Sequence, residues 1–450
     1  MLRPRFVLAA PASGSGKTMI TCGLLQALRA REMRVSSFKC GPDYIDPMFH
    51  EKVLGTKSAN LDLFFAGKET LRRLFLRDSE GTDVSVIEGV MGFYDGLSAA
   101  SDEASTYDVA RTLDAPVVLI VNARGQSLSA IAALQGFLRF KPDSGICGVI
   151  FNQMSPHVFE ALRPEVAALG VQPLGYVPKA SELVVESRHL GLVTPDEIAG
   201  LNERLSRLAA LLEDTVDIDA LLALARSAPE LEAAPRAPLP KLEGVRVAVA
   251  KDEAFCFLYR DNLALLEELG AELLYFSPIH DKGIPAGAQG LLLCGGYPEL
   301  YAEQLAANES MRREISAAIR EGMPCMAECG GFLYLHRELE DMSGRYHPMA
   351  GVLDTKAWRT NKLGRFGYIT LTAQENCGLL RGGEPIRAHE FHYYESGNCG
   401  DAMQAVKPVT GKSWRCMHAG ETLLAGFPHL FYESDPQLPL RFLQRCAGKE

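Results

Sequence analysis

A proline-rich stretch near the middle of the chain sets the strongest limit on how its 450 residues can fold. Residues 226–243 read RSAPELEAAPRAPLPKLE, and the four prolines exclude a regular helix. Leucines recur at helical spacing just before it, between residues 201 and 212, and a valine-rich run typical of a strand follows at 245–250. Because so long a stretch is unusual inside one domain, we predict two domains, 1–225 and 244–450, joined by a linker. The alternative is a long surface loop within a single domain.

Both halves have the pattern of α/β proteins. Short apolar runs without alternation are typical of parallel strands that are covered by helices on both faces, and helical stretches separate these runs. We therefore predict two α/β domains, the first of them with a mainly parallel sheet. The runs lie at residues 6–10, 84–87, 117–121 and 148–151 in the first half and at 245–250 and 290–293 in the second.

Charge and cysteine usage exclude several classes of protein. The net charge of −10 argues against a nucleic-acid-binding protein, which normally carries a basic face. The eleven cysteines are odd in number and irregularly spaced, and no C-x-x-C pair occurs, so we expect neither a disulfide framework nor a zinc ribbon. The longest apolar stretch, between Arg124 and Arg139, is too short and too polar to span a membrane. We expect a reduced, cytoplasmic protein.

The N-terminus carries a phosphate-binding loop. Residues 6–18 read FVLAAPASGSGKT, in which an expected strand enters a glycine-rich loop and a helical stretch follows. Backbone N–H groups of such a loop wrap phosphate oxygens, while Lys17 reaches the outer phosphates and the Thr18 hydroxyl binds Mg²⁺. Pro11 stands where the usual pattern has its first glycine, and a chance glycine-rich turn is the alternative. The residues expected to bind ATP here are Ser13, Gly14, Ser15, Gly16, Lys17 and Thr18.

Two further loops carry acids and a lysine suited to a metal–phosphate site. The run 84–87 ends in Glu88 and continues into a glycine-rich loop that contains Asp95, and residues 39–47 read KCGPDYIDP. We predict that Thr18, Asp46 and Glu88 bind Mg²⁺. Lys39, Asp43 and Asp95 are predicted to face the substrate or the transferred phosphoryl group. The alternative for each is a structural role in a turn or at a strand end.

The second half carries a candidate cysteine nucleophile. Residues 322–335 read GMPCMAECGGFLYL, a strand, sharp turn and helix that expose Cys329 at the turn. Gly330 permits that turn and offers a backbone N–H to an oxyanion, and a second donor is expected from Gly296 or Tyr297 in the CGGYPE loop. A histidine must activate the thiol. His429 is the candidate base and His392 its competitor, because chain order alone does not choose between them.

Taken together, these motifs resemble the cobyrinic acid a,c-diamide synthase family. The resemblance rests on SGSGKT, KCGPDYIDP, VIEGVMGFYDG, CGGYPE, AECGGFLYL, EFHYYES and GFPHLFYES, which span both halves of the chain. It implies a dethiobiotin-synthetase-like ATPase domain joined to a class I glutamine amidotransferase domain. The enzymes of this family are ligases that form C–N bonds with glutamine as amido donor, and they serve cobalamin biosynthesis.

The resemblance also implies a mechanism and its partners. Glutamine would be hydrolysed at Cys329 with His429 as base, and ATP with Mg²⁺ would phosphorylate the c- and then the a-acetate carboxylate of a corrin polycarboxylate. Ammonia would then displace phosphate from each acyl phosphate. Asn152 stands where related ATPase domains read adenine, and Arg188 is expected to meet substrate carboxylates. A homodimer is a possible assembly for a protein of this family.

Two departures and three rival functions accompany the resemblance. Phe431 stands two residues after His429, where many class I amidotransferases have Glu, so we predict a Cys–His dyad. Ala12 stands where partitioning ATPases carry an extra lysine. The rivals are the same reaction on hydrogenobyrinic acid, the same reaction on nickel-sirohydrochlorin, and a non-catalytic ATPase switch with a degenerate amidotransferase module. Cobyric acid synthase, a further relative, amidates other side chains.

Overall fold

The computed structural model describes residues 2–180 and 195–449, and the predicted substrate residue Arg188 lies outside them. The chain separates into two compact units, Met1–Arg236 and Ala237–Glu450. This division falls within the stretch 226–243, and no helix or strand is assigned between residues 229 and 243. Among the described residues, no helix is both long and apolar enough to cross a membrane.

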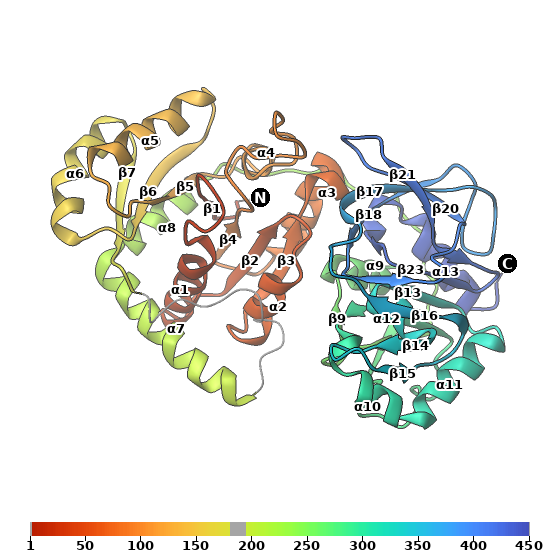
Figure 1. Cartoon of the computed structure of the whole chain (residues 1–450). Coiled ribbons are helices and arrows are strands. Elements are labelled where there is room, and N and C mark those ends of the chain that lie inside the picture. The colour runs from red at the N-terminus through yellow and green to blue at the C-terminus, as the bar shows by residue number, and fades with distance from the viewer. Residues whose placement is uncertain (1, 181–194, 450) are drawn as a thin grey trace. The chain divides into compact units, whose positions relative to one another are not determined.

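The first unit is built on a seven-stranded sheet in the order β3-β2-β4-β1-β5-β6-β7 (Figure 1). Every pair of neighbouring strands is parallel. The carboxyl ends of all seven strands therefore lie at one edge, and the loops that follow them converge there. The strands are β1 (Arg5–Ala9), β2 (Val35–Cys40), β3 (Lys57–Leu61), β4 (Val84–Glu88), β5 (Val117–Asn122), β6 (Ile146–Asn152) and β7 (Gln172–Val177).

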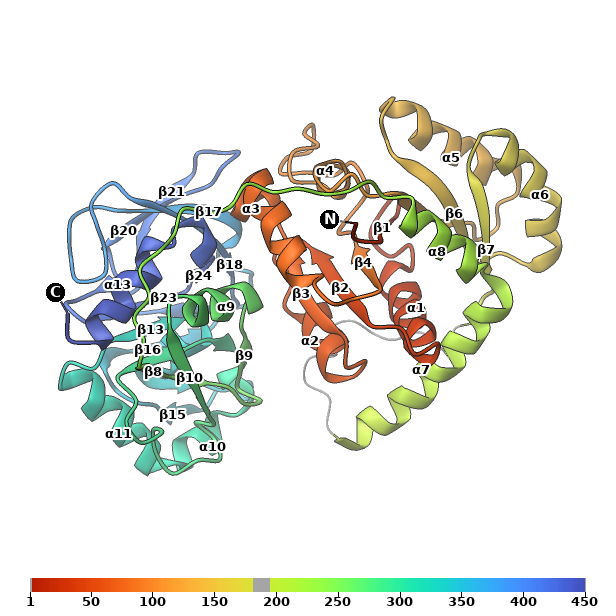
Figure 2. The ribbon, with the colours of Figure 1, turned by 180° about the vertical axis from the view of Figure 1, so that it is seen from behind.

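Helices cover both faces of this sheet, as expected for buried parallel strands. One apolar core joins the sheet to α1, α7 and α8, and a second joins the opposite face to α3, α4, α5 and α6. Figure 2 shows α7 and α8, in yellow-green, on the same side as α1. The helices are α1 (Lys17–Ala30), α2 (Ile45–Lys52), α3 (Leu63–Asp78), α4 (Thr106–Thr112), α5 (Leu128–Phe140), α6 (Pro156–Ala168), α7 (Pro195–Thr215) and α8 (Ile218–Arg226).

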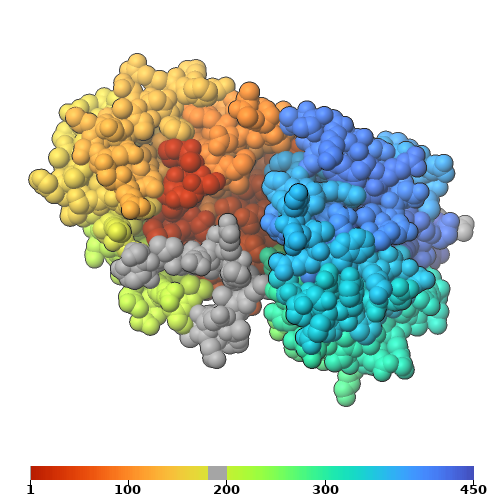
Figure 3. Space-filling model, in the orientation of Figure 1, coloured from red at the N-terminus to blue at the C-terminus, as the bar shows by residue number. Residues whose placement is uncertain are grey.

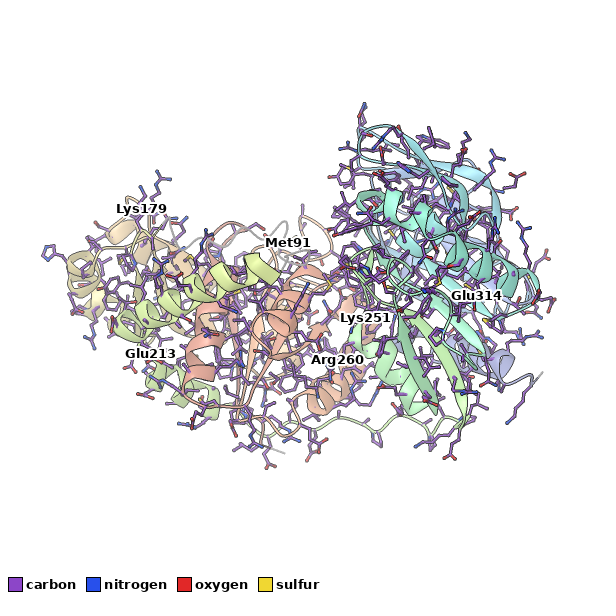
Figure 4. The ribbon with its side chains drawn as sticks, turned by 90° about the horizontal axis from the view of Figure 1, so that it is seen from below. Met91, Lys179, Glu213, Lys251, Arg260 and Glu314 are labelled. Carbon is purple, nitrogen blue, oxygen red and sulfur yellow. The ribbon has the colours of Figure 1, made fainter. Side chains whose placement is uncertain are left out.

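Close packing of α7 on α1 depends on a glycine. A Cβ atom on Gly23 would lie 2.7 Å from Leu208 Cγ and 2.6 Å from Leu212 Cδ1. Arg31, at the end of α1, is paired with Glu213 of α7, which Figure 4 labels. The helical leucine spacing between residues 201 and 212 is therefore the apolar stripe of α7, which covers the phosphate-loop helix.

The second unit has a six-stranded central sheet in the order β10-β8-β11-β13-β23-β22. Its pairs are parallel except for β22, which is antiparallel to β23. The strands are β8 (Val245–Ala250), β10 (Ala271–Phe276), β11 (Gly290–Leu293), β13 (Cys325–Glu328), β22 (His418–Ala419) and β23 (Leu423–Gly426). The helices are α9 (Arg260–Glu268), α10 (Ala302–Ala307), α11 (Glu309–Arg320), α12 (Gly330–Tyr334) and α13 (Gln437–Cys446). The α/β class predicted for both halves is confirmed.

The second unit also contains smaller sheets. A four-stranded sheet consists of β14 (His336–Glu340), β15 (Tyr346–Pro348), β16 (Leu353–Arg359) and β19 (Tyr394–Ser396). A five-stranded antiparallel sheet consists of β17 (Phe366–Ala373), β18 (Pro385–Phe391), β20 (Met403–Val406), β21 (Ser413–Cys416) and β24 (His429–Leu430). The short strands β9 (Phe255–Phe257) and β12 (Gly295–Gly296) pair with one another, and 3₁₀ turns follow at Pro298–Leu300 and Tyr432–Ser434.

Candidate functional sites

The glycine-rich loop between β1 and α1 has the backbone geometry that phosphate binding requires. Gly14 and Gly16 have φ angles of 78° and 98°, which favour glycine, and Gly16 caps α1. The Ser15 hydroxyl donates to the carbonyl of Ala12 over 2.9 Å. Asn152, at the end of β6, donates from Nδ2 to the carbonyl of Ser15 over 2.8 Å. The structure thus brings the predicted residue Asn152 directly against the loop.

Lys17 reaches across this loop to a second loop. Its ammonium donates to the carbonyl of Met91 over 2.6 Å and to that of Ala12 over 3.3 Å. Burial, together with the charge of Lys39, lowers the pKa of Lys17 to about 8. An anion bound beside this ammonium would stabilise its charged form, which is the response expected of a phosphate-binding lysine.

A buried cluster of charges lies beneath the loop. Lys39 Nζ is 2.6 Å from Asp46 Oδ2 and 2.7 Å from Glu88 Oε1, and Thr18 donates to the same Glu88 oxygen over 2.7 Å. Burial opposes the charge on Lys39, but the charges of Glu88 and Asp46 outweigh it and raise the lysine pKa. One ammonium thus faces two carboxylates, so the cluster favours a further cation.

Glu88 also carries a buried oxygen that is free of hydrogen bonds within the described structure. Among the described residues, its Oε2 is buried and has no hydrogen-bond partner, and His50 Nε2 lies 3.8 Å away. Burial lowers the pKa of His50 to about 4, so this histidine is neutral near pH 7. Within the part of the chain that the structure describes, no three His, Cys, Asp or Glu side chains form a metal cage. An Mg²⁺ ion that takes most of its ligands from phosphates and water needs only one or two protein ligands.

Asp43 and Asp95, predicted to face substrate, both support their own loops. Asp43 Oδ1 accepts from the backbone N–H of Ile45 over 2.7 Å and thereby starts α2. Burial and the charge of Asp46 raise the pKa of Asp43 to about 6. Asp95 Oδ2 accepts from the N–H of Gly92 over 2.9 Å. Asp43 also lines the cavity described next, whereas Asp95 is absent from its described lining.

A cavity of about 760 Å³ joins these loops at the carboxyl edge of the sheet. In the space-filling view the red N-terminal segment reaches the surface of this unit (Figure 3). Arg124 and Lys179 also line the cavity, and Lys179 is labelled with Met91 in Figure 4. Neither cation was predicted from the sequence, although each follows a strand whose end lies at this edge. The predicted residues that line it are Ser13, Gly14, Gly16, Lys17, Thr18, Lys39, Asp43, Asp46 and Asn152.

In the second unit, Cys329 occupies a strained turn between β13 and α12. Its φ and ψ angles are 46° and −100°, which a residue with a side chain adopts only where its surroundings impose them. The Cys329 N–H donates to the carbonyl of Gly426 over 2.8 Å. Burial and the charge of Glu299 raise the pKa of the thiol. Cys329 is therefore a protonated thiol that needs a base before it can act as a nucleophile.

The two predicted oxyanion loops meet beside this cysteine. A Cβ atom on Gly330 would lie 2.8 Å from the backbone nitrogen of Gly296, and one on Gly331 would lie 2.0 Å from the carbonyl of Leu293. Only glycine fits such contacts, so the Gly-Gly pair after Cys329 allows α12 to pack on the neighbouring loop. Tyr297, the other predicted donor, directs its N–H to the carbonyl of Ala254 over 2.9 Å. The geometry therefore favours Gly296 and Gly330 over Tyr297.

The structure separates the two candidate histidines. A Cβ atom on Gly295 would lie 2.4 Å from His429 Cε1, so the ring of His429 lies against the oxyanion loop. Burial, with the charges of His389 and His392, lowers the pKa of His429 to about 3, which leaves a neutral ring that can accept a proton.

His392 instead stacks on Phe427, with ring centroids 3.8 Å apart. Its Nε2 lies 3.1 Å from Glu390 Oε1. Phe431, which replaces the usual Glu, packs its ring against Tyr259. An aromatic contact thus occupies the position two residues after His429 where many class I amidotransferases place a carboxylate.

Comparison with known proteins agrees with this arrangement of two sites. Residues 6–192 match the model of the CobQ/CobB/MinD/ParA nucleotide binding domain. Residues 246–436 match that of the CobB/CobQ-like glutamine amidotransferase domain. The matched ranges contain the phosphate loop and Cys329, respectively.

Several relatives match the chain over nearly its whole length. The chain is 39% identical to a cobyrinate a,c-diamide synthase of Caldanaerobacter subterraneus over 98% of each chain. It is 36% identical to one of Picrophilus torridus, again over 98% of each chain. It is 38% identical to a hydrogenobyrinate a,c-diamide synthase of Streptomyces coelicolor over 98% of this chain and 97% of the relative. The chain therefore belongs to the cobyrinate a,c-diamide synthase family of ATP-using, glutamine-dependent ligases.

Proposed function

We propose that this enzyme amidates the a- and c-acetate carboxylates of cobyrinic acid, with ATP and glutamine, through acyl-phosphate intermediates. The observation that carries the proposal is that one chain holds a cavity lined by a glycine-rich loop with Lys17, and a strained cysteine beside a second glycine loop. A carboxylate is a poor electrophile, so amidation needs both an activating phosphoryl group and a source of ammonia. The two sites supply these two needs.

The second unit would release ammonia from glutamine. His429 takes the Cys329 proton, and the thiolate attacks the side-chain amide carbon. The N–H groups of Gly296 and Gly330 stabilise the oxyanion that forms. The imidazolium returns its proton to the leaving ammonia, and water then hydrolyses the thioester to glutamate. Since Phe431 replaces the usual acid, we propose that Cys329 and His429 act as a dyad.

The first unit would activate the carboxylate. The glycine-rich loop and Lys17 hold the ATP phosphates, and Asn152 supports this loop from β6. A substrate carboxylate oxygen attacks the γ-phosphorus and ADP leaves. Ammonia then attacks the acyl carbon, and phosphate departs with the former carboxylate oxygen. Lys17 and Lys39 offset the negative charge that gathers on the transferred group.

The buried cluster fits a magnesium ion. Thr18 Oγ1 and the unpartnered Glu88 Oε2 would hold it, with Asp46 close by. When bound, the ion neutralises charge on the outer phosphates of ATP. Lys39 would keep the two carboxylates ionised and oriented, because it bonds to both.

The cations that line the cavity could attract an anionic substrate to an acidic protein. The protein carries a net charge of −10, yet its proposed substrate is a polycarboxylate. Arg124 and Lys179 line the same cavity as Lys17 and Lys39 and make it locally cationic. We propose that Arg124 and Lys179 contact substrate carboxylates or phosphates, together with Arg188 from outside the described residues.

A substrate panel tests this function. The enzyme is incubated with ATP, Mg²⁺ and glutamine and with cobyrinic acid, hydrogenobyrinic acid or nickel-sirohydrochlorin, and the products are analysed by mass spectrometry. We expect cobyrinic acid to yield a diamide in which two carboxylates have become amides. Preferential diamidation of hydrogenobyrinic acid would mean that hydrogenobyrinic acid, and not cobyrinic acid, is the substrate. The similarity to the hydrogenobyrinate a,c-diamide synthase of Streptomyces coelicolor supports this alternative. ATP hydrolysis without any amide product would contradict the proposal.

A further inference from the structure

A carboxylate that the mechanism above does not use belongs to the turn that packs beside the nucleophile. Glu299 belongs to the 3₁₀ turn Pro298–Leu300, which follows directly on the oxyanion strand β12. A Cβ atom on Gly330 would lie 3.0 Å from Pro298 Cδ. The turn that carries Glu299 is therefore packed on the first residue of α12, immediately after Cys329.

Glu299 has little compensation from the protein for its charge. It is half-buried, and its own backbone N–H is the one hydrogen-bond donor that acts on its carboxylate among the described residues. Arg359, at the end of β16, is the one cation whose charge acts on it, but Arg359 is exposed and forms no ion pair with it in the described structure. Burial raises the pKa of Glu299 to about 7.

The position of this carboxylate opposes the chemistry of Cys329 unless a cation joins it. The charge of Glu299 contributes to the raised pKa of the Cys329 thiol. Burial raises the pKa of Tyr394, and the charge of Glu299 raises it further. Tyr394 lies opposite Arg359 in the pairing of β19 with β16. A carboxylate that is removed from water without a partner is costly, and next to a nucleophile it suppresses the thiolate. A ligand that brings a cation to this place would relieve both effects.

The amido donor carries such a cation. When the amide carbon of glutamine lies at Cys329, the other end of the molecule presents an α-ammonium group a few bonds away. We propose that Glu299 binds the α-ammonium of glutamine and so selects an α-amino acid as the amido donor. The inference rests on the glutamine hydrolysis of the proposed function. It adds a consequence: the bound ammonium offsets the charge of Glu299, so Cys329 ionises more readily once glutamine is in place.

The test compares two donors in two variants. Glu299→Gln keeps the shape of the side chain but removes its charge, and Glu303→Gln, on the exposed side of α10, is the matched control. Hydrolysis of glutamine and of its analogue without the α-amino group, glutaramate, is followed in single turnovers at high enzyme concentration. We expect Glu299→Gln to lower kcat/KM for glutamine about 10- to 100-fold, the range for a lost charged hydrogen bond. Glutaramate should lose little, and Glu303→Gln should match the unaltered enzyme with both donors.

Two results would overturn the inference. One is an unchanged kcat/KM for glutamine in Glu299→Gln, and the other is an equal loss for glutamine and glutaramate, which would make Glu299 a merely structural residue. Amidation with ammonium chloride in place of glutamine should stay unaltered in both variants, because it depends on the first unit. Circular dichroism spectra that match the unaltered enzyme, together with retained hydrolysis of glutaramate, verify the fold of the second unit. Because the hydrolysis assay contains neither ATP nor a tetrapyrrole, a wrong substrate in the proposed function would leave its outcome untouched.

Discussion

Replacement of Cys329 by alanine is expected to abolish glutamine-dependent amidation while ammonia-dependent amidation continues. The alanine side chain cannot form a thioester, so glutamine hydrolysis should fall by about 10⁴-fold or more, as for other lost nucleophiles. The ATP site lies in the other unit and needs only ammonia. The measurement is diamide formation with glutamine and, separately, with ammonium chloride at a pH where free ammonia is present.

The control for this variant is Cys377→Ala, which removes a half-buried cysteine outside the regular strands of the same unit. It should leave both activities near those of the unaltered enzyme. Equal loss of glutamine-driven and ammonia-driven amidation in Cys329→Ala, with the circular dichroism spectrum unchanged, would contradict two separate sites.

Replacement of Lys17 by alanine should lower amidation with either nitrogen source and leave glutamine hydrolysis intact. Its ammonium donates hydrogen bonds to two loop carbonyls, and Lys17 lines the cavity, where it would face the ATP phosphates. Loss of one preorganised charge at a phosphoryl group lowers the rate by about 10²–10³-fold. We expect ATP-dependent amidation to fall by this factor with either nitrogen source, while glutamine hydrolysis measured without ATP persists.

Lys68→Ala is the matched control for Lys17→Ala, because Lys68 is an exposed lysine of the same unit that pairs with Asp108. It should retain full amidation. If Lys17→Ala lost no more amidation activity than Lys68→Ala, the glycine-rich loop could not be the nucleotide site.

The turns at both proposed chemical centres could be predicted because each depends on a short contiguous motif. Backbone geometry at Gly14, Gly16 and Cys329 follows from local residue choice, and the structure shows the expected turns there. Residues that act across chain segments were harder to find. Arg124 and Lys179 join the cavity only through the parallel sheet, and the turn that carries Glu299 reaches Gly330 only through tertiary packing.

Our preference for His429 over His392 needed the structure for the same reason. His429 comes from a short strand in a different sheet from β13, the strand before Cys329, and its contact with Gly295 has no signal in local sequence. Acidic residues in loops posed the reverse difficulty. Asp43 and Asp95 are acids in loops of the kind that bind metal and phosphate, but both accept hydrogen bonds from backbone N–H groups of their own loops. A side chain that accepts backbone N–H groups cannot be distinguished by residue type from one that meets substrate.

Apolar parallel strands were easier to predict than the rest of the fold. Strands β1, β4 and β8 are mostly apolar and appear as apolar runs. The parallel strands β2 and β3 contain serine and lysine and were not predicted. The strands of the antiparallel sheets alternate between buried and exposed residues, as β18 does, and they were not predicted. The helix α8 was also missed, because it ends where the proline-rich stretch begins.

Isotope transfer tests the central claim, that the ATP site activates a carboxylate for attack by ammonia, most directly. Cobyrinic acid labelled with oxygen-18 in its carboxylates is incubated with ATP, Mg²⁺ and glutamine, and the inorganic phosphate released is analysed by mass spectrometry. An acyl phosphate transfers a carboxylate oxygen to phosphorus, so we predict one labelled oxygen in the phosphate for each amide formed. Unlabelled phosphate alongside normal amide formation would contradict the account.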